Sequence, residues 1–294
     1  MKYVRILWSY LCGLAYTLWL MLVPKKRLDS VAGKPHPHLV VTLTSYGRRV
    51  AKTVPHVLAS LLVQTKRPDR IILWLDDEHF SESNLPKRLQ VMRDKYGIEI
   101  HFCEDLRSYK KLVPTLQLCP NDILVTVDDD LVYRRGLLEK LYEAHLATPN
   151  MVLCPLAHQP RVHEGRLLPY RQWRHNLTAH PGGLIFPLGG SGTLYPPGSL
   201  HPDVVDSGLF MRLSPQADDV WFWAMALRAG TDIRLIDWKY PLFQIDLLYQ
   251  KMHKGASLMA ANLHEDNNDR QIANIAAHYP DFYALVMNRV TCGS

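Results

Sequence analysis

The sequence predicts an α/β fold, in which helices flank a mainly parallel sheet, from two observations. Short apolar runs that start near residues 39, 71, 98 and 123 alternate with segments of helical periodicity. This spacing is typical of βαβ units, which form a buried, Rossmann-like parallel sheet with right-handed crossovers. The 294 residues are 47% hydrophobic and 21% charged, an ordinary globular composition that excludes disorder and a small disulfide scaffold.

Strands and helices are expected to alternate through the first half of the chain. The predicted strands are Leu39–Ser45, Ile71–Leu75, Ile98–Phe102 and Ile123–Val127. The predicted helices between them are Ala51–Gln64, Leu85–Lys95 and Tyr109–Leu118, the last interrupted by Pro114. The first of these helices carries one apolar stripe at helical spacing, made of Val54, Val57, Leu58, Leu61 and Leu62.

The second half of the chain has a different texture. A helix at 136–147 and a strand at 151–155 precede residues 158–202, which are rich in Pro, Gly, His and aromatic residues and have little periodicity. Long irregular segments in compact domains are commonly binding loops. A further helix at 217–229, a strand at 232–236 and a polar helical tail complete the expected elements.

An apolar segment lies near the start of the chain. Residues 6–23 carry no charge and would span about 27 Å as a helix, against about 30 Å for a bilayer core. No A-x-A site follows, and Pro24-Lys25-Lys26-Arg27 does not suit cleavage, so we favour a retained membrane-associated helix over a signal peptide. Such a helix spans the bilayer or lies in its interface. We expect residues 1–30 to be a membrane anchor with a basic flank.

The net charge of +6 is concentrated at the same end. Residues 1–35 contain six basic residues and one acidic residue, and the rest of the chain is nearly neutral. This distribution favours a membrane surface and excludes a nucleic acid partner, which would need basic charge on the folded body. The larger basic count follows the apolar segment, which predicts a main domain on the cytoplasmic face of the inner membrane. Five cysteines without a CxxC pair agree with a reducing compartment.

Polar residues follow each predicted strand of the first half. They are Ser45-Tyr46-Gly47-Arg48-Arg49, Asp76-Asp77-Glu78, Glu104-Asp105 and Asp128-Asp129-Asp130. Ligands bind open α/β sheets outside the carboxyl ends of the strands, so these residues are the first candidates for a site. The first turn has neither a GxGxxG nor a P-loop pattern, which excludes a dinucleotide or phosphate loop of the usual kind.

The acidic triplet predicts a metal site. Three consecutive carboxylates repel one another and ionise at low cost only beside a cation. Hard oxygen ligands select Mg²⁺ or Mn²⁺, either of which can also hold a diphosphate. Asp128 and Asp130 are one residue apart and can act from one side of an extended turn. The alternative is a solvated turn, in which aspartate is also a favoured residue.

Four segments occur in one order along the chain and carry a resemblance to a known family. They are Val40 to Tyr46, Val125 to Asp130, Ala217 to Trp221, and Leu227 to Gly230. With these segments the sequence resembles the nucleotide-sugar glycosyltransferases of the GT-A fold, particularly the bacterial family 2-like group. The chain lacks a Gln-x-x-Arg-Trp motif and further apolar spans, so it does not resemble a processive polysaccharide synthase.

The resemblance implies roles for particular residues. The family's Asp-x-Asp metal motif corresponds to Asp128 and Asp130, and its paired acids before the acceptor-side helix correspond to Asp218 and Asp219. In inverting members the second acid of the pair is the general base, which implies Asp219. Capping of the helix is the structural alternative for these acids and is compatible with catalysis. Related enzymes often add a late histidine to the metal, for which the candidates are His264 and His253.

The residues expected to bind the donor lie at or just after strand ends, before the triplet, or within it: Thr44, Ser45, Tyr46, Arg48, Asp76, Lys111 and Asp129. Tyr46 is expected to stack on a base, and either Arg48 and Arg49 or Lys110 and Lys111 to face the diphosphate. Asp76 or Asp77 is expected to accept hydrogen bonds from uracil or ribose. For Arg49 and Lys110, exposed surface charge is the alternative.

Two further features are candidates for lining a sugar site. The glycine-rich segment from Gly189 to Pro197 permits close approach of a ligand to the backbone, with Tyr195 as a stacking surface. A plain structural turn is the alternative. Trp173, Trp221 and Trp223 could form an apolar platform for sugar rings, although tryptophan at helical spacing is more often part of a core.

The expected protein is a metal-dependent, inverting glycosyltransferase that moves a sugar from a nucleoside diphosphate to a surface-glycan or glycolipid acceptor. Residues 31–294 would form its GT-A catalytic domain, with 31–135 as the nucleotide-sugar-binding half and 136–294 as the acceptor-binding half. Two alternatives stay open. A nucleotidyltransferase on a similar sheet would release pyrophosphate, and a non-catalytic membrane-tethered carbohydrate-binding protein would bind glycan without releasing a nucleotide.

Overall fold

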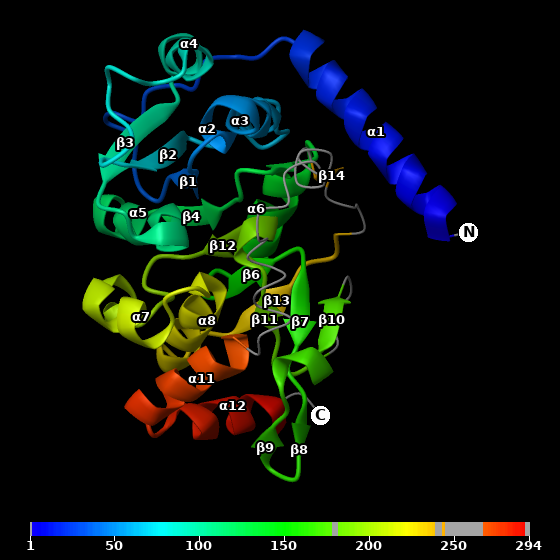
Figure 1. Ribbon diagram of the computed structural model, residues 1–294, viewed down its shortest axis with the longest axis vertical. Helices are drawn as coiled ribbons and strands as arrows, with labels where there is room; N and C mark the ends of the chain where they lie inside the picture. The colour runs from blue at the N-terminus through cyan, green and yellow to red at the C-terminus, as the bar shows by residue number, and fades with distance from the viewer. Residues whose placement is uncertain (1, 178–181, 239–242, 245–266, 292–294) are drawn as a thin grey trace.

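The computed structural model describes residues 2–177, 182–238, 243–244 and 267–291 (Figure 1). The helices in these residues are α1 (Lys2–Leu22), α2 (Arg49–Lys52), α3 (Val54–Leu62), α4 (Lys87–Tyr96), α5 (Val113–Leu118), α6 (Leu137–Ala147), α7 (Ser207–Leu213), α8 (Asp218–Arg228), α11 (Asn267–His278) and α12 (Phe282–Thr291). Short 3-10 helices are η1 (Arg107–Lys111), η2 (Tyr170–Gln172), η3 (Gly189–Ser191) and η4 (Pro202–Val205).

Seven strands form the central sheet in the order β13-β6-β12-β4-β1-β2-β3. They are β1 (Leu39–Thr44), β2 (Arg70–Asp76), β3 (Glu99–Cys103), β4 (Ile123–Thr126), β6 (Val152–Cys154), β12 (Thr193–Tyr195) and β13 (Ile233–Leu235). Strand β12 runs antiparallel to its neighbours β4 and β6, and the other pairs are parallel. The predicted mainly parallel sheet is confirmed.

Three smaller sheets complete the strands of the described residues, in the orders β10-β7-β11, β14-β5 and β8-β9. Their members are β5 (Leu131–Val132), β7 (Ala157–Gln159), β8 (Val162–His163), β9 (Arg166–Leu167), β10 (Arg174–Leu177), β11 (Phe186–Pro187) and β14 (Phe243–Gln244). Most of these strands belong to the segment 158–202 or adjoin it, so much of that segment forms sheets separate from the central one.

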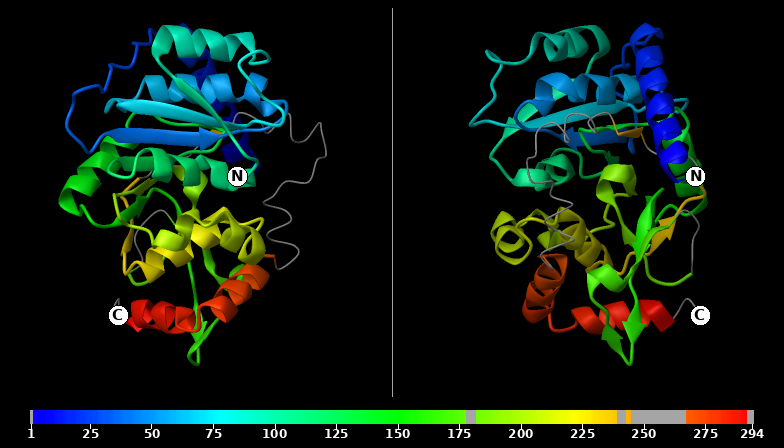
Figure 2. Two further views of the ribbon diagram at one scale, coloured as in Figure 1. Left: turned by 90° about the vertical axis from the view of Figure 1, so that its left-hand side faces the viewer. Right: turned by 45° about the vertical axis from the view of Figure 1, so that its right-hand side comes forward.

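Helices cover both faces of the central sheet (Figure 2). Val41 and Leu43 of β1 pack in the cluster that holds α3, α4 and α6, whereas Val40 packs in the cluster that holds α5, α7 and α8. Successive side chains of a strand point to opposite faces, so a strand covered on both sides becomes apolar throughout. Helices α11 and α12 extend the second cluster beyond α8. The strand ends are therefore where polar side chains can gather.

Two of the departures from the expected elements concern α5 and β12. Residues 109–118 form the end of η1 and then α5, because Pro114 lies in the first turn of α5, where its missing N–H removes no helical bond. Within residues 158–202, which were expected to be irregular, β12 inserts into the central sheet between β4 and β6. A strand of three residues between glycines and prolines is too short to show a period, which is why the sequence did not predict it.

Helix α1 packs along the outside of the domain (Figure 1). Leu20 is 1% exposed and packs with Val63 and Val132. The hydroxyl of Tyr16 donates to the backbone carbonyl of Tyr133 at 3.2 Å. Among the residues that the structure describes, no helix has both the length and the apolar character needed to cross a bilayer.

Candidate active site

The acidic triplet follows β4 at the carboxyl edge of the sheet. Its middle residue, Asp129, is 6% exposed. Oδ2 of Asp129 accepts a hydrogen bond from Ser45 Oγ at 2.6 Å, and Oδ1 accepts one from Arg49 Nη1 at 2.8 Å. Ser45 follows β1, which pairs with β4, so neighbouring strands bring these groups together. Burial raises the pKa of Asp129, although Arg49 and Ser45 act to lower it. Both carboxylate oxygens of Asp129 are occupied within the protein.

The two outer acids of the triplet are more exposed. The side chain of Asp128 is 43% exposed and that of Asp130 is 19% exposed. Oδ2 of Asp130 lies 3.2 Å from Arg49 Nη1. Nη1 of Arg49 therefore contacts both Asp129 and Asp130, at the turn that follows β4. Metal binding by Asp128 and Asp130 stays a prediction.

A buried lysine holds three carboxylates together. Lys111 is 5% exposed. Its Nζ lies 2.8 Å from Oδ2 of Asp218, 3.4 Å from Oδ1 of Asp128 and 3.9 Å from Oδ1 of Asp219. Burial alone would lower the pKa of Lys111, but the three carboxylates raise it well above its ordinary value. One ammonium facing three carboxylates leaves an excess of negative charge, which favours a further cation.

Two elements position this lysine and its partners. Lys111 ends η1, and its backbone carbonyl accepts a hydrogen bond from Thr42 Oγ1 of β1 at 2.8 Å. Asp218 and Asp219 form the first turn of α8. The helix N-terminus carries partial positive charge, so carboxylates are favoured there before any ligand binds. The cluster thus joins the predicted donor half to the predicted acceptor half.

Gly189 and Gly190 of η3 lie directly against the acids. The N–H of Gly189 donates to Oδ1 of Asp219 at 3.1 Å. A Cβ atom on Gly190 would lie 1.7 Å from Oδ2 of Asp128, and one on Gly189 would lie 2.5 Å from Oδ1 of Asp219. No side chain fits at these distances, so the close approach of the loop requires glycine. The glycine-rich segment therefore forms one wall of the acid cluster.

Tyr133 also supports the cluster and was not anticipated from the sequence. It is 0% exposed, and its hydroxyl accepts from the N–H of Asp128 at 2.8 Å and donates to the carbonyl of Gly190. Burial raises the pKa of Tyr133 well above its ordinary value, so the hydroxyl stays protonated. In the sequence, Tyr133 is only an aromatic residue three positions after the triplet. Its role in the cluster depends on the tertiary contact with Gly190, which the sequence does not show.

Asp219 combines a raised pKa with access to solvent. Its pKa is raised to about 7, chiefly by burial and further by the charges of Asp218 and Asp128, while Lys111 and the N–H of Gly189 act to lower it. Its side chain is still 29% exposed. A partly exposed carboxyl group whose pKa is raised toward neutrality is a candidate general base, and this role of Asp219 stays a prediction.

Thr44 and Asp76, like Ser45, Lys111 and Asp129, are predicted donor-binding residues that are engaged inside the protein. Thr44 Oγ1 donates to the backbone carbonyl of Trp74 at 2.9 Å. Asp76 is 4% exposed, and its Oδ1 lies 2.5 Å from His79 Nδ1 and accepts from the His79 N–H at 2.9 Å. Asp76 therefore holds the turn after β2. Donor binding by either residue stays a prediction.

The remaining predicted residues lie in different surroundings. Tyr46 is 57% exposed, and the guanidinium of Arg49 lies 5.4 Å from its ring centre. Arg48 is exposed. Arg49 and Lys110 are not free surface charges, because Arg49 pairs with the triplet and Lys110, 3% exposed, pairs with Asp105. His264 and His253, the predicted late histidines, lie outside the described residues.

The predicted aromatic platform for sugar rings is wrong. Trp173, Trp221 and Trp223 are 4%, 0% and 0% exposed, and their indole N–H groups donate to backbone carbonyls. Tyr195, predicted as a stacking surface, is 2% exposed. Large aromatic side chains contribute more to stability inside the core than at the surface, and these four residues belong to the core.

The strand order and the acids at its carboxyl edge define the class of fold. The chain has a GT-A-type fold, the fold of nucleotide-sugar glycosyltransferases. It is similar to the crystal structure of S. aureus TarS 1-349 in complex with UDP-GlcNAc, with 14% identity and a TM-score of 0.50. The match covers 85% of this chain and 71% of that chain.

Two further solved structures match with lower TM-scores. One is glucosyl-3-phosphoglycerate synthase from Mycobacterium tuberculosis in complex with Mn²⁺, UDP and phosphoglyceric acid, at 18% identity, a TM-score of 0.32, and coverage of 42% of this chain and 43% of that chain. The other is CMP:2-keto-3-deoxy-manno-octonic acid synthetase with CTP, at 14% identity, a TM-score of 0.45, and coverage of 78% and 100%. No family model matches the chain, and no curated protein matches it.

Proposed function

We propose that the protein is a glycosyltransferase, which moves a sugar from a nucleoside diphosphate to an acceptor hydroxyl. The observation that carries the proposal is the convergence on Lys111 of Asp128, Asp218 and Asp219 from the end of β4 and the start of α8. This convergence occurs at the edge where α/β sheets bind ligands. A protein that only binds glycan has no use for a solvent-accessible carboxyl group with a pKa of about 7 at that edge.

Asp128 and Asp130 would hold the Mn²⁺ or Mg²⁺ ion. Their carboxylate oxygens are hard ligands of the kind that both ions prefer. Asp128 is one of the three carboxylates around Lys111, which together leave net negative charge, and Asp130 lies beside Arg49. When bound, the ion would supply positive charge for the departing diphosphate.

Asp219 is the base in the proposed reaction. Its ionised carboxylate takes the proton of the acceptor hydroxyl as the acceptor oxygen bonds to the anomeric carbon. The bond from that carbon to the diphosphate oxygen breaks, and the nucleoside diphosphate leaves with the electron pair. Attack from the face opposite the leaving group inverts the configuration. Lys111 and the N–H of Gly189 hold the cluster that positions Asp219.

The donor binds to the half formed by residues 31–135. Tyr46 and Arg48 are exposed, so Tyr46 would meet the base and Arg48 the diphosphate. Ser45 and Asp129 act indirectly, because the hydrogen bond between them holds the triplet in place. The similar structure of S. aureus TarS is in complex with UDP-GlcNAc, so uridine diphosphate sugars are the first donors to test.

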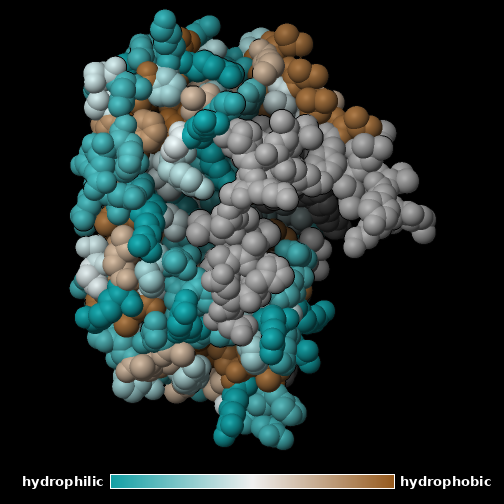
Figure 3. Space-filling model, in the orientation of Figure 1, coloured by the Kyte–Doolittle hydropathy of each residue, from teal (hydrophilic) through white to brown (hydrophobic). Residues whose placement is uncertain are grey.

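Helix α1 would bring the enzyme to a membrane that carries a surface-glycan or glycolipid acceptor. Its large exposed apolar side chains are Leu11, Leu14, Leu18, Trp19, Met21 and Leu22. Figure 3 shows this apolar surface along α1, whose other face packs on the domain through Leu20. A helix with one apolar exposed face and a basic flank lies in the membrane interface, here that of the cytoplasmic side of the inner membrane.

A thermal-shift panel of UDP-, GDP-, CMP- and TDP-linked sugars, with and without Mn²⁺, tests the proposal. A ligand that binds the folded state raises Tm according to its concentration over its Kd. We expect a Mn²⁺-dependent rise with one nucleotide class, lost in Asp130→Ala, and release of nucleoside diphosphate in the presence of acceptor. Release of pyrophosphate from a nucleoside triphosphate would instead establish a nucleotidyltransferase, and glycan binding without any nucleotide response would establish a binding protein.

A further inference from the structure

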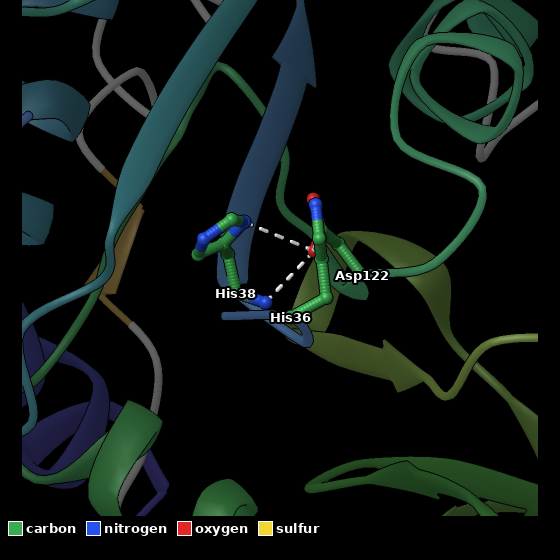
Figure 4. Close-up of side chains that lie close together, drawn as sticks. All are labelled: His36, His38 and Asp122. Atoms are coloured by element: carbon green, nitrogen blue, oxygen red, sulfur yellow. Dashed lines mark hydrogen bonds and ion pairs between the residues drawn. The ribbon is translucent and has the colours of Figure 1, made fainter. Parts of the chain in front are cut away.

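A second group of ligating side chains lies away from the acid cluster. His36, His38 and Asp122 each offer one ligating atom, and these atoms lie within 4.8 Å of one another. Nδ1 of His36 lies 2.5 Å from Oδ1 of Asp122, and Nδ1 of His38 lies 3.1 Å from the same oxygen. Figure 4 shows the two rings and the carboxylate turned toward a common point.

The fold places this group at the opposite edge of the sheet from the proposed active site. His38 directly precedes β1, and Asp122 directly precedes β4, its parallel neighbour. The N–H of Ile123 donates to the carbonyl of His38 at 2.9 Å, which sets the two segments side by side. Asp128 follows β4 at the other end, six residues further on, or roughly 20 Å along an extended chain. The group therefore does not belong to the acid cluster.

The chemistry of the three side chains suits a transition metal better than a hard cation. Two imidazole nitrogens and one carboxylate oxygen are ligands typical of Zn²⁺, with a fourth position for water. The rings are inclined at 61° with centroids 4.3 Å apart, so their Nδ1 atoms approach the shared point from different directions. In a tetrahedral zinc site the ligating atoms lie about 3.3 Å apart, which requires only a small opening of the present contacts.

Hydrogen bonding alone leaves the group incompletely satisfied. Oδ1 of Asp122 already accepts from the backbone N–H of His38 at 2.8 Å, so two imidazoles and one amide crowd one oxygen. His38 is 6% exposed, and within the described part of the chain its Nε2 has no hydrogen-bond partner. Zinc bound at both Nδ1 atoms would relieve the crowding at Oδ1 of Asp122, whereas Nε2 of His38 would still lack a partner.

The surroundings permit an ion to enter. The side chain of His36 is 56% exposed, whereas those of His38 and Asp122 are 7% and 2% exposed, so the group opens to solvent on one side. Arg70, a cation whose charge acts on this region, is committed to Glu99 through two hydrogen bonds of 2.7 and 2.6 Å. Arg70 therefore pairs with Glu99, and Asp122 has His36 and His38 as its partners.

We propose that His36, His38 and Asp122 bind one Zn²⁺ ion, which fastens the segment before β1 to the start of β4. The ion would replace the Nδ1–H bonds to Asp122, and the imidazole protons would move to Nε2. It would act on stability and on the position of the segment that connects α1 to the sheet. This site is separate from the proposed transferase function and does not depend on it.

The test is a titration of the full chain with ZnCl₂ in excess Mg²⁺, which keeps hard oxygen sites occupied, followed by thermal shift and by equilibrium dialysis with metal analysis. We expect one tightly bound zinc per chain and a rise in Tm. His36→Ala should weaken binding by at least about tenfold, since it removes a ligand at an exposed position without disturbing the core. Co²⁺ in place of zinc should give the visible absorption of a tetrahedral site, absent in His36→Ala.

Two variants distinguish a zinc site at these three residues from zinc binding at another histidine and from a group held by hydrogen bonds alone. His79→Ala removes a histidine that pairs with Asp76 at the same 2.5 Å distance but has no second histidine beside it, so zinc binding should be unchanged. Asp122→Asn keeps an oxygen that can accept from the N–H of His38, so the fold is retained while the anionic ligand is lost. Equal zinc binding by wild type and His36→Ala, or a wild-type Tm that responds to pH but not to micromolar zinc, would overturn the proposal.

Discussion

The ammonium of Lys111 lies 2.8 Å from Oδ2 of Asp218, and this contact links the end of η1 to the first turn of α8. The two side chains are 7% and 11% exposed, so the pair is shielded from water. Lys111 also faces Asp128 and Asp219, and it is the positive charge around which the proposed active site is built. Its removal should therefore affect stability and metal binding together.

We expect Lys111→Met to lower the free energy of unfolding by about 3–5 kcal/mol, because it leaves buried carboxylates without their cation. Mn²⁺ should restore part of this loss, since a divalent ion can take over the neutralising role. Urea unfolding with and without Mn²⁺ measures both effects. The matched control is Lys110→Met, whose partner Asp105 lies outside the acid cluster. For Lys110→Met we expect a smaller loss of stability and no recovery with Mn²⁺. Equal recovery of both variants with Mn²⁺ would contradict the neutralising role given to Lys111.

Gly190→Ala should impair function without unfolding the domain. The added Cβ would lie 1.7 Å from Oδ2 of Asp128, so the carboxylate must move by an ångström or more. Displacement of that size in a site costs about a hundredfold in activity. Loss of the Mn²⁺-dependent response to donor in thermal shift, with a normal circular dichroism spectrum, would support this prediction. Gly136→Ala is the control, because its Cβ would meet Trp238 at an ordinary 3.6 Å.

The activity should depend on the ionisation of Asp219. Its pKa of about 7 means that the base form is populated only at higher pH, so kcat/KM should rise through about pH 7. Asp219→Asn should lower kcat by about 10²–10⁴-fold with donor binding retained. Asp218→Asn removes a charge that raises this pKa, so the rise in the profile should move to lower pH. A profile that is flat between pH 5 and 9 in wild type would remove Asp219 from the mechanism.

The stability of the folded protein should also depend on the ionisation of Asp219, but it should fall over the pH range in which the activity rises. The pKa of Asp219 in the folded protein lies above its ordinary value of 3.8, so its protonated form is favoured by folding. The stabilisation is full below pH 3.8 and is lost as the pH rises through about 7. The metal-free protein should therefore show a fall in Tm across this range that is reduced in Asp219→Asn. An equal fall in the Tm of wild type and Asp219→Asn would show that other titrating groups cause it.

Glu99 and Arg70 form an ion pair whose contribution to stability depends on pH. Burial would raise the pKa of Glu99, but two hydrogen bonds from Arg70 and one from His101 lower it to about 2. Glu99→Gln should cost about 1–3 kcal/mol at pH 7, with the lower end expected because the carboxylate is partly solvated. This difference should shrink as the pH falls from 4.5 through about 2, as urea titrations can measure. Glu82→Gln, in an exposed pair with Arg93, is the control and should have little effect.

The exposed face of α1 should control membrane binding. Leu14 and Leu18 are 59% and 52% exposed, and replacing both by Gln removes apolar surface from the face that would enter the lipid. Binding to vesicles that contain anionic lipid, measured by co-sedimentation, should fall at least tenfold, at about 0.8 kcal/mol for each buried CH₂ group lost. Val91→Gln changes an equally exposed apolar residue on α4 and should leave binding unaltered. Unchanged sedimentation of the α1 variant would contradict the membrane role.

Much of the architecture was predictable because it depends on local periodicity. The apolar runs that became β1 to β4 and the helix stripe from Val54 to Leu62 report burial directly, since side chains alternate in strands and recur every three to four residues in helices. The acids after β4 followed from the same reasoning, because strand ends mark the ligand-binding edge. The segment 158–202 was less predictable, since β12 has three residues and takes its place from its neighbours β4 and β6.

The sequence by itself determined which residues the proposed function assigns to the chemistry, namely the triplet at 128–130 and the acids that begin α8. Only the tertiary structure decided how these residues are arranged. Contacts between Lys111 and Asp218, or between Gly190 and Asp128, join segments far apart in the chain, and no local pattern encodes them. The middle acid of the triplet turned inward to Ser45 and Arg49 for the same reason, because burial and charge pairing depend on which strands become neighbours in space.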